Sequence, residues 1–542
     1  MMPSIPSRDA FQQKRKIRLS SKQRKYRYRV RQSLPPLAEA KRLPLAEKFD
    51  LPYYYRRTRP LFRLIVNNYL NLLENWIRPI KGKEAYSKVF KVIDPPAAVA
   101  NFLSDEDFAW QRVAGVNPVV IQRVRDRLPD TLEIDEQSLL SLIDSSASSL
   151  SEVIEHGRLF IADYSILNGL SKGRYADLNK VLYDPLVVFH YGSTSNQKPF
   201  LRPIIIQLSQ SQQNNTLVSY KDGEQWYSAK WHVQTADAHY HQFVVHLVWS
   251  HLVFEPFPIA TNRQLSENHP VHILLKPHCK YSLAINEFGR LNLLFPKGYG
   301  ENLFAASLDG IKALATKAFG LWSFEESLFE NDIAARGMEQ LEEYPYRDDG
   351  LLIINAIEEF VREYLKIYYK NDEDVKNDHE LVAWLNELRS ETAGNVKGLP
   401  EKLQDIETLA RTIRHIIFIS AVLHSAVNYP QWDYMGSALN MATSAYKHVD
   451  AEEQQGEGTE DLPPFTQLMK QMNFIYYISK PYHNFLGQYR AKDFTDEKAW
   501  TAIRNFQIKL NQIESTINQR NGYRHRPYTG LLPSRISNSL NT

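Results

Sequence analysis

Cysteine is almost absent from this chain of 542 residues, because Cys279 is the only one. A single thiol excludes an intramolecular disulfide and a zinc site built from several thiolates. Long hydrophobic runs are missing as well: HIIFISAVLHSAV, the longest, spans about a dozen residues, whereas a membrane-spanning helix needs about 20. The first thirty residues contain no apolar core of the kind that a secretory signal peptide needs. The sequence therefore predicts neither a transmembrane helix nor a signal peptide, and we expect a cytoplasmic location.

An excess of one charge is also missing: 65 Lys and Arg residues face 62 Asp and Glu residues, which leaves a formal net charge of +3. This balance does not indicate a partner class, and we expect no nucleic-acid partner. The N-terminal arm (1–44) differs, because residues 8–31 carry eleven basic side chains against Asp9 alone. Two interpretations stay open: the arm is a solvated, mobile leader, or it rests on an anionic membrane surface, where each basic residue contributes roughly 1 kcal/mol.

Helical periodicity dominates the rest of the chain. Segments such as Arg63–Ile77, Ile353–Tyr369 and Ala499–Ile517 place apolar residues three and four positions apart, which is typical of amphipathic helices. Strand-like runs occur only in the middle, around DPLVVFHYG and RPIIIQLS. The acidic stretch DAEEQQGEGTEDLPP (450–464) is typical of an exposed loop. We therefore predict a mainly α protein: one large helical domain over 45–542 with a long central helix and a small antiparallel sheet.

The stretch HYHQFVVHLVWSHLVFEPF (239–257) places four histidines in an otherwise apolar and aromatic sequence. In a regular α-helix each residue turns about 100°, so His246 and His251 would lie roughly 140° apart and could not share one ligand. A π-bulge would bring both rings toward the same side, and such bulges are frequent at functional sites. Further along, HSAVN places His424 and Asn428 on one helix face. We expect three imidazoles and an amide oxygen to converge in a dry interior.

A structural alternative is that each histidine is a separately hydrogen-bonded core residue, as a lone buried histidine usually is. A nearly apolar helix, however, gains nothing from repeated polar rings unless something binds them. Neutral nitrogens and hard oxygens without a thiolate suit iron or manganese. The cluster therefore favours a metal site, with iron the better fit and manganese the lesser alternative.

The spacing of these histidines resembles that of the lipoxygenase family. Its signature separates five histidines by four, four, seventeen and eight residues, and that pattern falls on His241, His246, His251, His269 and His278. Other segments are similar to the family too, namely DFAWQRVAGVNP, HSAVN, NFLGQY and PYTGLLPSRISNSLNT. The resemblance covers roughly residue 45 to the end. It implies a single lipoxygenase catalytic domain whose long central helix contains a π-bulge.

The resemblance also implies one non-haem iron with a bound hydroxide. Its protein ligands would be His246, His251, His424, Asn428 and the terminal carboxylate of Thr542. Family members usually end in isoleucine, but because the ligand is a main-chain group, we expect metal binding to survive the change. Gln242 and Gln431 match glutamines that support the ligands through hydrogen bonds. The other signature histidines are expected to orient or stabilise the structure.

Lipoxygenases insert O2 into polyunsaturated fatty acids, so the implied substrates are O2 and a fatty acid of the linoleate or linolenate type. The implied reaction removes hydrogen from the methylene between two cis double bonds, and O2 then adds to the radical to give a hydroperoxide. Gly289 stands where the family carries alanine or glycine, and glycine predicts the R product. Leu293, one helical turn on, should line the same channel. The structural alternative is that Gly289 ends a turn before a helix.

Two other functions stay open. One is a hydroperoxide isomerase, or epoxyalcohol synthase, which uses the same iron; the proposed ligands do not separate it from a dioxygenase. The other is a non-catalytic lipid-binding protein, against which the complete ligand set argues. Met441 stands where some relatives carry an arginine for the substrate carboxylate, so the sequence assigns no residue to the head group.

The attachment of the protein to a membrane is a further expectation. Plant and animal lipoxygenases usually carry an N-terminal β-sandwich, which we expect to be missing, and we expect a monomer that is peripheral at a membrane. Residues 43–70 combine tyrosines 53 to 55 with arginines 56, 57 and 59, a mixture that suits a membrane interface. An ordinary packed helix explains this segment equally well.

Overall fold

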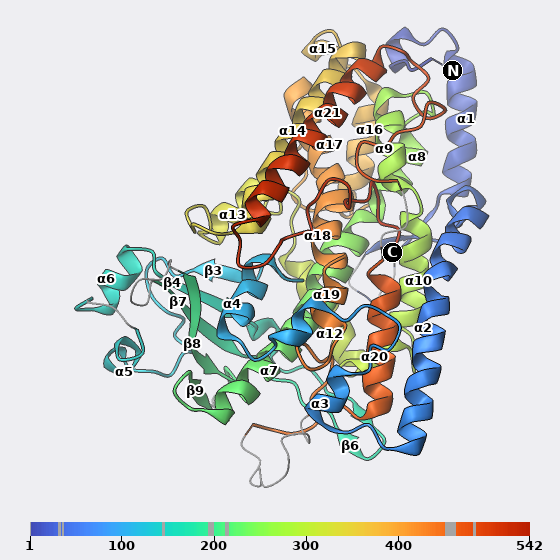
Figure 1. Cartoon of the computed structure of the whole chain (residues 1–542). Helices are drawn as coiled ribbons and strands as arrows, with labels where there is room; N and C mark the ends of the chain where they lie inside the picture. Colours follow the sequence, from blue (N-terminus) through green and yellow to red (C-terminus); the bar gives the residue numbers. More distant parts are fainter. Residues whose placement is uncertain are drawn as a thin grey trace.

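The computed structural model describes residues 2–30, 34, 37–143, 147–192, 200–211, 216–449, 462–480 and 484–542. Helices make up most of this part of the chain, and the strands form only small sheets, which confirms the predicted mainly α fold (Figure 1). Most of the acidic stretch 450–464, predicted to be an exposed loop, lies outside the described residues.

A continuous helix of 41 residues, Glu224–Gln264, runs through the centre of the molecule. It consists of α7 (Glu224–His239), the π-helical segment η5 (Tyr240–Leu252) and α8 (Pro256–Gln264). By length and composition this helix could cross a membrane, but 94% of its most apolar window is buried inside the protein. It is therefore the core helix of the fold, and the predicted long central helix is confirmed.

The other helices pack around this axis, each with an apolar stripe turned inward. In α14, for example, Ile353, Ile357 and Phe360 follow one another at helical spacing and are buried. Several helices begin at a carboxylate that accepts a backbone N–H, such as Asp405 before α17. The longer ones are α1 (Gln12–Lys25), α2 (Leu51–Ile77), α4 (Asp105–Ala114), α9 (Pro270–Cys279), α10 (Ser282–Leu293), α12 (Leu308–Leu321), α14 (Pro345–Tyr368), α16 (His379–Arg389), α17 (Ile406–Ile417), α20 (Phe465–Ile478) and α21 (Ala499–Asn521).

Shorter helices connect these. They are α3 (Gly82–Ser87), α5 (Glu136–Leu140), α6 (Leu150–Glu155), α11 (Tyr299–Leu303), α13 (Phe329–Ala335), α15 (Asp372–Lys376), the π-helical segment η6 (Phe418–Leu423), α18 (His424–Asn428) and α19 (Gln431–Met435). Because η6 leads directly from α17 into α18, these three elements form a second continuous helix. This helix packs against η5 in the middle of the molecule.

An antiparallel sheet of five strands lies at one side of the helices, where the sequence predicted it (Figure 1). Its order is β3 (Ile121–Arg123), β4 (Leu159–Asp163), β7 (Leu186–Gly192), β8 (Phe200–Gln207) and β9 (Leu217–Ser219). In β7, Val187 and Phe189 face the main helical core, whereas Leu186 and Val188 face a smaller core beside α5 and α6. Both faces of the strand are therefore buried, which explains its unbroken apolar sequence. Two-stranded sheets are formed by β1 (Tyr28–Val30) with β2 (Ala38–Ala40) and by β5 (Arg174–Tyr175) with β6 (Leu178–Asn179).

The basic N-terminal arm is a packed helix in the structure. Helix α1 lies against α8, and the Arg15 guanidinium is buried between Glu380, with Nε 2.6 Å from Oε1, and Asp9, with Nη1 2.8 Å from Oδ2. A buried cation paired with two carboxylates holds the helix in place. The expectation of a mobile leader is thus wrong for α1, and contact with a membrane stays a prediction.

Candidate active site

Three histidines from two continuous helices meet at the centre of the molecule. His246 and His251 come from η5 and His424 from the first turn of α18, and all three are buried. The ring centroids of His246 and His251 are 4.9 Å apart, and those of His251 and His424 are 4.8 Å apart. One ring nitrogen of each histidine lies within 4.8 Å of the others. Such a group could hold one metal ion.

The π-helical geometry of η5 brings the first two rings together. Its hydrogen bonds join residues five apart, so side chains five apart come to the same side of the helix. The expected single π-bulge is in fact a π-helical run of 13 residues, Tyr240–Leu252. A second run, η6, directly precedes His424 and was not expected.

Burial keeps the three rings neutral. It lowers the pKa of His251 to about 4, although hydrogen bonding to Asn286 acts against the shift. Burial, together with neighbouring imidazoles, holds the pKa values of His246 and His424 well below their ordinary range. The main chain of Thr542 opposes the shift at His424, which places the C-terminus beside this ring. Neutral imidazoles are the form that binds metals.

The hydrogen bonds around the cluster leave nitrogens pointing inward. His246 Nε2 and the ring nitrogens of His424 are buried and have no hydrogen-bond partner in the part of the chain that the structure describes. His251 Nδ1 lies 2.9 Å from Asn286 Oδ1, an acceptor, so Nδ1 carries the proton and Nε2 is left for a ligand. Orphaned buried nitrogens are costly unless something binds them. The residues present therefore fit a metal ion.

The expected amide and carboxylate lie beside the three rings. Asn428 Nδ2 donates to Thr542 Oγ1 at 2.9 Å, and Gln431 Nε2 donates to Asn428 Oδ1 at 2.8 Å. Thr542 is only 5% exposed and borders the same cavity as His246. Threonine in place of isoleucine thus adds a side-chain hydrogen bond to Asn428.

Gln242 contacts the cluster from one turn before His246. Its Nε2 lies 3.3 Å from His246 Nδ1, while its Oε1 is buried and has no partner among the described residues. A metal at His246 Nε2 needs a proton on Nδ1 and therefore requires the Gln242 oxygen to face the ring. Both predicted supporting glutamines, Gln242 and Gln431, accordingly lie where they can contact a proposed ligand.

The remaining signature histidines make other contacts. His241 Nε2 lies 2.8 Å from the Val427 carbonyl oxygen and so joins η5 to α18. His269 caps α9 and pairs with Asp378. His278 Nδ1 lies 2.7 Å from the carbonyl oxygen of Asn538 and holds the C-terminal segment. Each therefore has a structural partner in place of a ligand.

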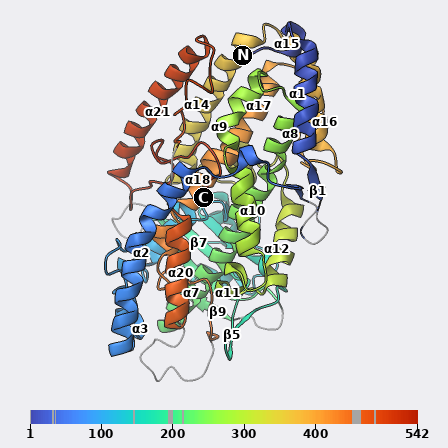
Figure 2. The ribbon, with the colours of Figure 1, turned by 90° about the vertical axis from the view of Figure 1, so that its right-hand side faces the viewer.

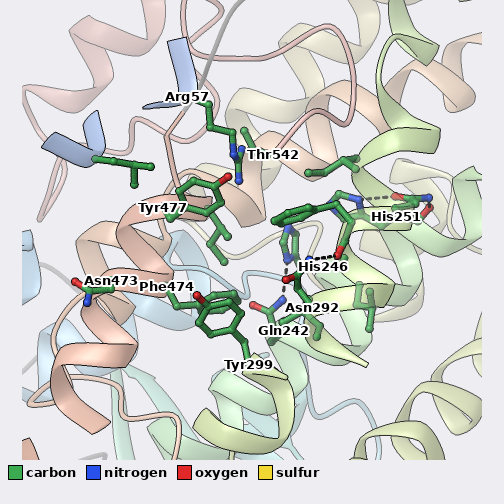
Figure 3. Close-up of a pocket in the computed structure, with 18 of the residues that line it drawn as sticks. Arg57, Gln242, His246, His251, Asn292, Tyr299, Asn473, Phe474, Tyr477 and Thr542 are labelled. Carbon is green, nitrogen blue, oxygen red and sulfur yellow. Dashed lines mark hydrogen bonds between the residues drawn. The ribbon is translucent and has the colours of Figure 1, made fainter. Parts of the chain in front are cut away.

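A largely apolar cavity of about 470 Å³ opens onto the cluster (Figure 3). Its walls come from α2, η5, α10 and α20, with the C-terminal residue at one side. Residues that border it include Arg57, Leu61, Leu64, Ile65, Gln242, His246, His251, Phe288, Gly289, Leu293, Tyr477 and Thr542. An apolar cavity with few polar groups is the usual form of a small-molecule site.

Gly289 lies within α10 and borders this cavity, as does Leu293 one turn later. Its φ is negative, and a Cβ added at Gly289 would meet no atom within 4 Å. The alternative that Gly289 ends a turn is therefore wrong: no backbone demand requires glycine here. The missing methyl group leaves open space in the cavity wall.

Arg57 borders the cavity, which its sequence position did not predict. The sequence predicts a membrane-facing mixture of tyrosines and arginines here, but Arg57 and Tyr53 are buried, whereas Tyr54 and Tyr55 are exposed. The Arg57 guanidinium lies 3.8 Å from the centre of the Tyr477 ring and points into the cavity (Figure 3). Helical spacing could have indicated that Arg57 is buried. It follows Tyr53 by four residues and precedes the buried Leu64 by seven, so the three residues share one face of the helix.

A buried chain of polar contacts leads outward from His251, and none of its members was predicted. Asn286 Nδ2 donates to Glu255 Oε2 at 3.0 Å, and the same carboxylate pairs with Arg290 Nη1 at 2.6 Å. Arg290 Nε also lies 3.0 Å from Oε2 of Glu39, on β2. The N-terminal segment is thereby connected to a proposed metal ligand.

Comparison with known proteins agrees with this geometry. The lipoxygenase family model matches residues 72–529. The chain is 32% identical over 488 residues to the linoleate 9/13-lipoxygenase of Pseudomonas aeruginosa, which covers 85% of this chain and 70% of that protein. A lipoxygenase crystallised anaerobically with arachidonate has a TM-score of 0.89 and 28% identity, over 100% of this chain and 84% of its own. Coral 8R-lipoxygenase has a TM-score of 0.89 and 27% identity, over 100% and 83%.

Proposed function

Since this chain belongs to the lipoxygenase family, we propose that it uses one non-haem iron to convert free polyunsaturated fatty acids of the linoleate or linolenate type into R hydroperoxides. The observation that carries the proposal is the cavity itself, which joins the three-histidine cluster and the C-terminus to an apolar channel. The known relatives support the substrate class, because one is named a linoleate lipoxygenase and another was crystallised with arachidonate.

The metal would be held by His246, His251, His424, the Asn428 side chain and the carboxylate of Thr542. Bound there, iron would supply one-electron chemistry for removal of a hydrogen atom and for return of an electron after oxygen addition. Nitrogen and oxygen donors without a thiolate support iron over softer metals. The protein keeps the rings neutral by burial and holds Asn428 through Gln431.

The substrate would lie with its hydrocarbon chain against the apolar walls and its carboxylate at Arg57. This orientation is supported by the position of the guanidinium, which is only 4% exposed and borders the cavity. A planar cation in an apolar cavity pairs strongly with a carboxylate. Met441, at the position where some relatives carry an arginine, is fully buried. The cation that pairs with the substrate carboxylate would thus be Arg57 on α2.

The open space at Gly289 would admit O2 to one end of the pentadienyl radical. Because the cavity wall lacks a methyl group at this point, oxygen can approach a carbon that alanine would cover. The likeness to coral 8R-lipoxygenase supports the same chirality. Leu293 would border this space from the next turn.

The test is incubation of the purified protein with linoleate in air, with oxygen uptake, conjugated-diene absorbance and chiral chromatography as readouts. We expect about one O2 consumed for each hydroperoxide formed, with R product in excess. Conversion of an added hydroperoxide without oxygen uptake would show an isomerase instead. Arg57→Leu should raise KM for linoleate but not for its methyl ester, and Arg59→Leu, at an exposed position of the same helix, is the matched control.

A further inference from the structure

Helix α2 buries several polar side chains and exposes many large apolar ones. A surface helix normally turns apolar residues inward and polar residues toward water. On α2 the inward side includes Arg57, Asn67 and Asn71, all buried. Its outward side carries large exposed apolar residues, among them Trp76 at 83% and Ile77 at 72% exposed. Such an arrangement is expected where the outer side meets an apolar phase and not bulk water.

Exposed apolar residues also occur on helix α10, at Leu291, and just beyond its end, at Phe295. Figure 2 shows α2 and α10 on the side of the molecule that faces the viewer. We call this surface the α2–α10 face. It also reaches the cavity, because Ile65 and Phe288 are both exposed and border it. The mouth of the cavity therefore opens within the apolar surface.

Exposed basic side chains occur on helix α1. Figure 1 shows α1 and α2 along the same edge of the molecule. Although Arg15 anchors α1 inward, Lys14, Lys16 and Lys25 are exposed. A basic surface beside an apolar one complements a bilayer with anionic head groups, whose charge attracts lysines within a Debye length.

We propose that the α2–α10 face docks on an anionic lipid bilayer, with Trp76 and Ile77 inserted at the interface and the cavity mouth turned toward the lipid. Tryptophan, tyrosine and aliphatic side chains with flanking basic residues form the composition of an interfacial helix. The choice of lipid as the partner rests on the proposed function, because a fatty-acid substrate enters from a lipid phase through a mouth in this surface.

The experiment compares sedimentation with vesicles, which needs no turnover, for three forms of the full chain. The vesicles contain phosphatidylcholine alone or phosphatidylcholine with phosphatidylglycerol. Trp76→Ser/Ile77→Ser removes two exposed anchors that do not border the cavity. Ile508→Ser on α21, outside this face, removes an apolar side chain that is 57% exposed and is the matched control.

We expect the wild type and Ile508→Ser to sediment with the anionic vesicles. The partition coefficient of Trp76→Ser/Ile77→Ser should fall at least roughly tenfold, because two large apolar side chains no longer leave water. Its thermal midpoint and its activity on detergent-dispersed linoleate should match the wild type. A failure of the proposed function would appear only in the activity assay and would leave vesicle binding unchanged.

Three results would overturn the proposal. One is a wild type that stays in the supernatant with every vesicle. Another is a double variant that sediments as the wild type does. The third is a wild-type dimer in analytical ultracentrifugation that the double variant converts to a monomer without any vesicle binding, which would assign the α2–α10 face to a second copy of the chain.

Discussion

At the scale of single residues, Gly289 matters through the methyl group that it lacks. Gly289→Ala should shift the product from R toward S, because the new methyl group fills the space through which oxygen reaches the radical. The fold should not suffer: the added Cβ meets no atom within 4 Å, and alanine in a helix interior is favoured over glycine by about 1 kcal/mol. Chiral chromatography and thermal melting measure the two effects. An unchanged excess of R product in Gly289→Ala would show that this position does not control the chirality of the product.

The three clustered histidines support a second prediction at this scale. His246→Ala, His251→Ala and His424→Ala should each fold but retain little iron, because each removes one of few donors in a dry site. Metal analysis of the purified variants measures the loss, with circular dichroism as the check on folding. His272→Ala is the matched control: that ring is also buried, but its Nδ1 lies 3.0 Å from the Leu265 carbonyl oxygen, outside the cluster. Full iron in any of the three variants would remove that histidine from the ligand set.

At the scale of secondary-structure elements, the contact of β2 with α10 links the N-terminal segment to the proposed metal site. Glu39 on β2 and Glu255 share the buried Arg290 guanidinium, and Glu255 accepts from Asn286, which holds His251. A buried cation keeps its charge only while carboxylates surround it. Glu39 is therefore a positioning residue for His251, to which it is connected by four contacts in series.

Glu39→Gln tests this connection. Removing one of the two charges that pair with Arg290 should lower the free energy of unfolding by about 2 kcal/mol and speed the loss of iron to a chelator, with KM for linoleate unchanged. Glu74→Gln, which breaks an exposed pair with Lys91, should change the free energy by less than about 1 kcal/mol and leave iron release as in the wild type. If both variants release iron at the same rate, β2 does not act on the metal site.

At the scale of the whole molecule, the C-terminal residue Thr542 is buried in the interior of the protein. The terminal segment is held along its way inward: Tyr53 donates to the Asn541 carbonyl oxygen at 2.9 Å, and the backbone N–H of Ser537 donates to Ser425 Oγ at 3.2 Å. Thr542 then lies beside His424 and Asn428. Tyr53 on α2 and Ser425 on α18 therefore help to hold Thr542 at the proposed metal site.

A C-terminal affinity tag should accordingly abolish most iron binding, whereas an N-terminal tag should not. The tag converts the Thr542 carboxylate into an amide and forces polar backbone into a buried site. Iron content and oxygen uptake of the two tagged forms give the comparison. Thr542→Ile keeps the carboxylate and should hold iron, at a cost of about 1 kcal/mol for the lost hydrogen bond to Asn428. Equal iron in both tagged forms would exclude the carboxylate as a ligand.

The sequence by itself determined the features that depend on local spacing. Apolar residues three and four apart predicted the helices, and β-branched runs predicted the sheet, because these periods follow from backbone geometry. The five-residue interval between His246 and His251 required a π turn if the two rings were to meet. The pair His424 and Asn428 needed only an ordinary helix. The candidate cluster was therefore visible before any tertiary contact was known.

Only the tertiary structure decided which side of each helix is buried and which distant residues meet. Arg15 is anchored by Glu380, 365 positions away, so no local pattern distinguished the packed α1 from a mobile leader. Arg57 and Trp76 lie on one helix, yet the first borders the cavity and the second faces outward, because α20 and the C-terminal segment cover only one side of α2. A residue is buried when another segment packs over it. That segment can lie hundreds of positions away, so the local sequence does not reveal which residues it covers.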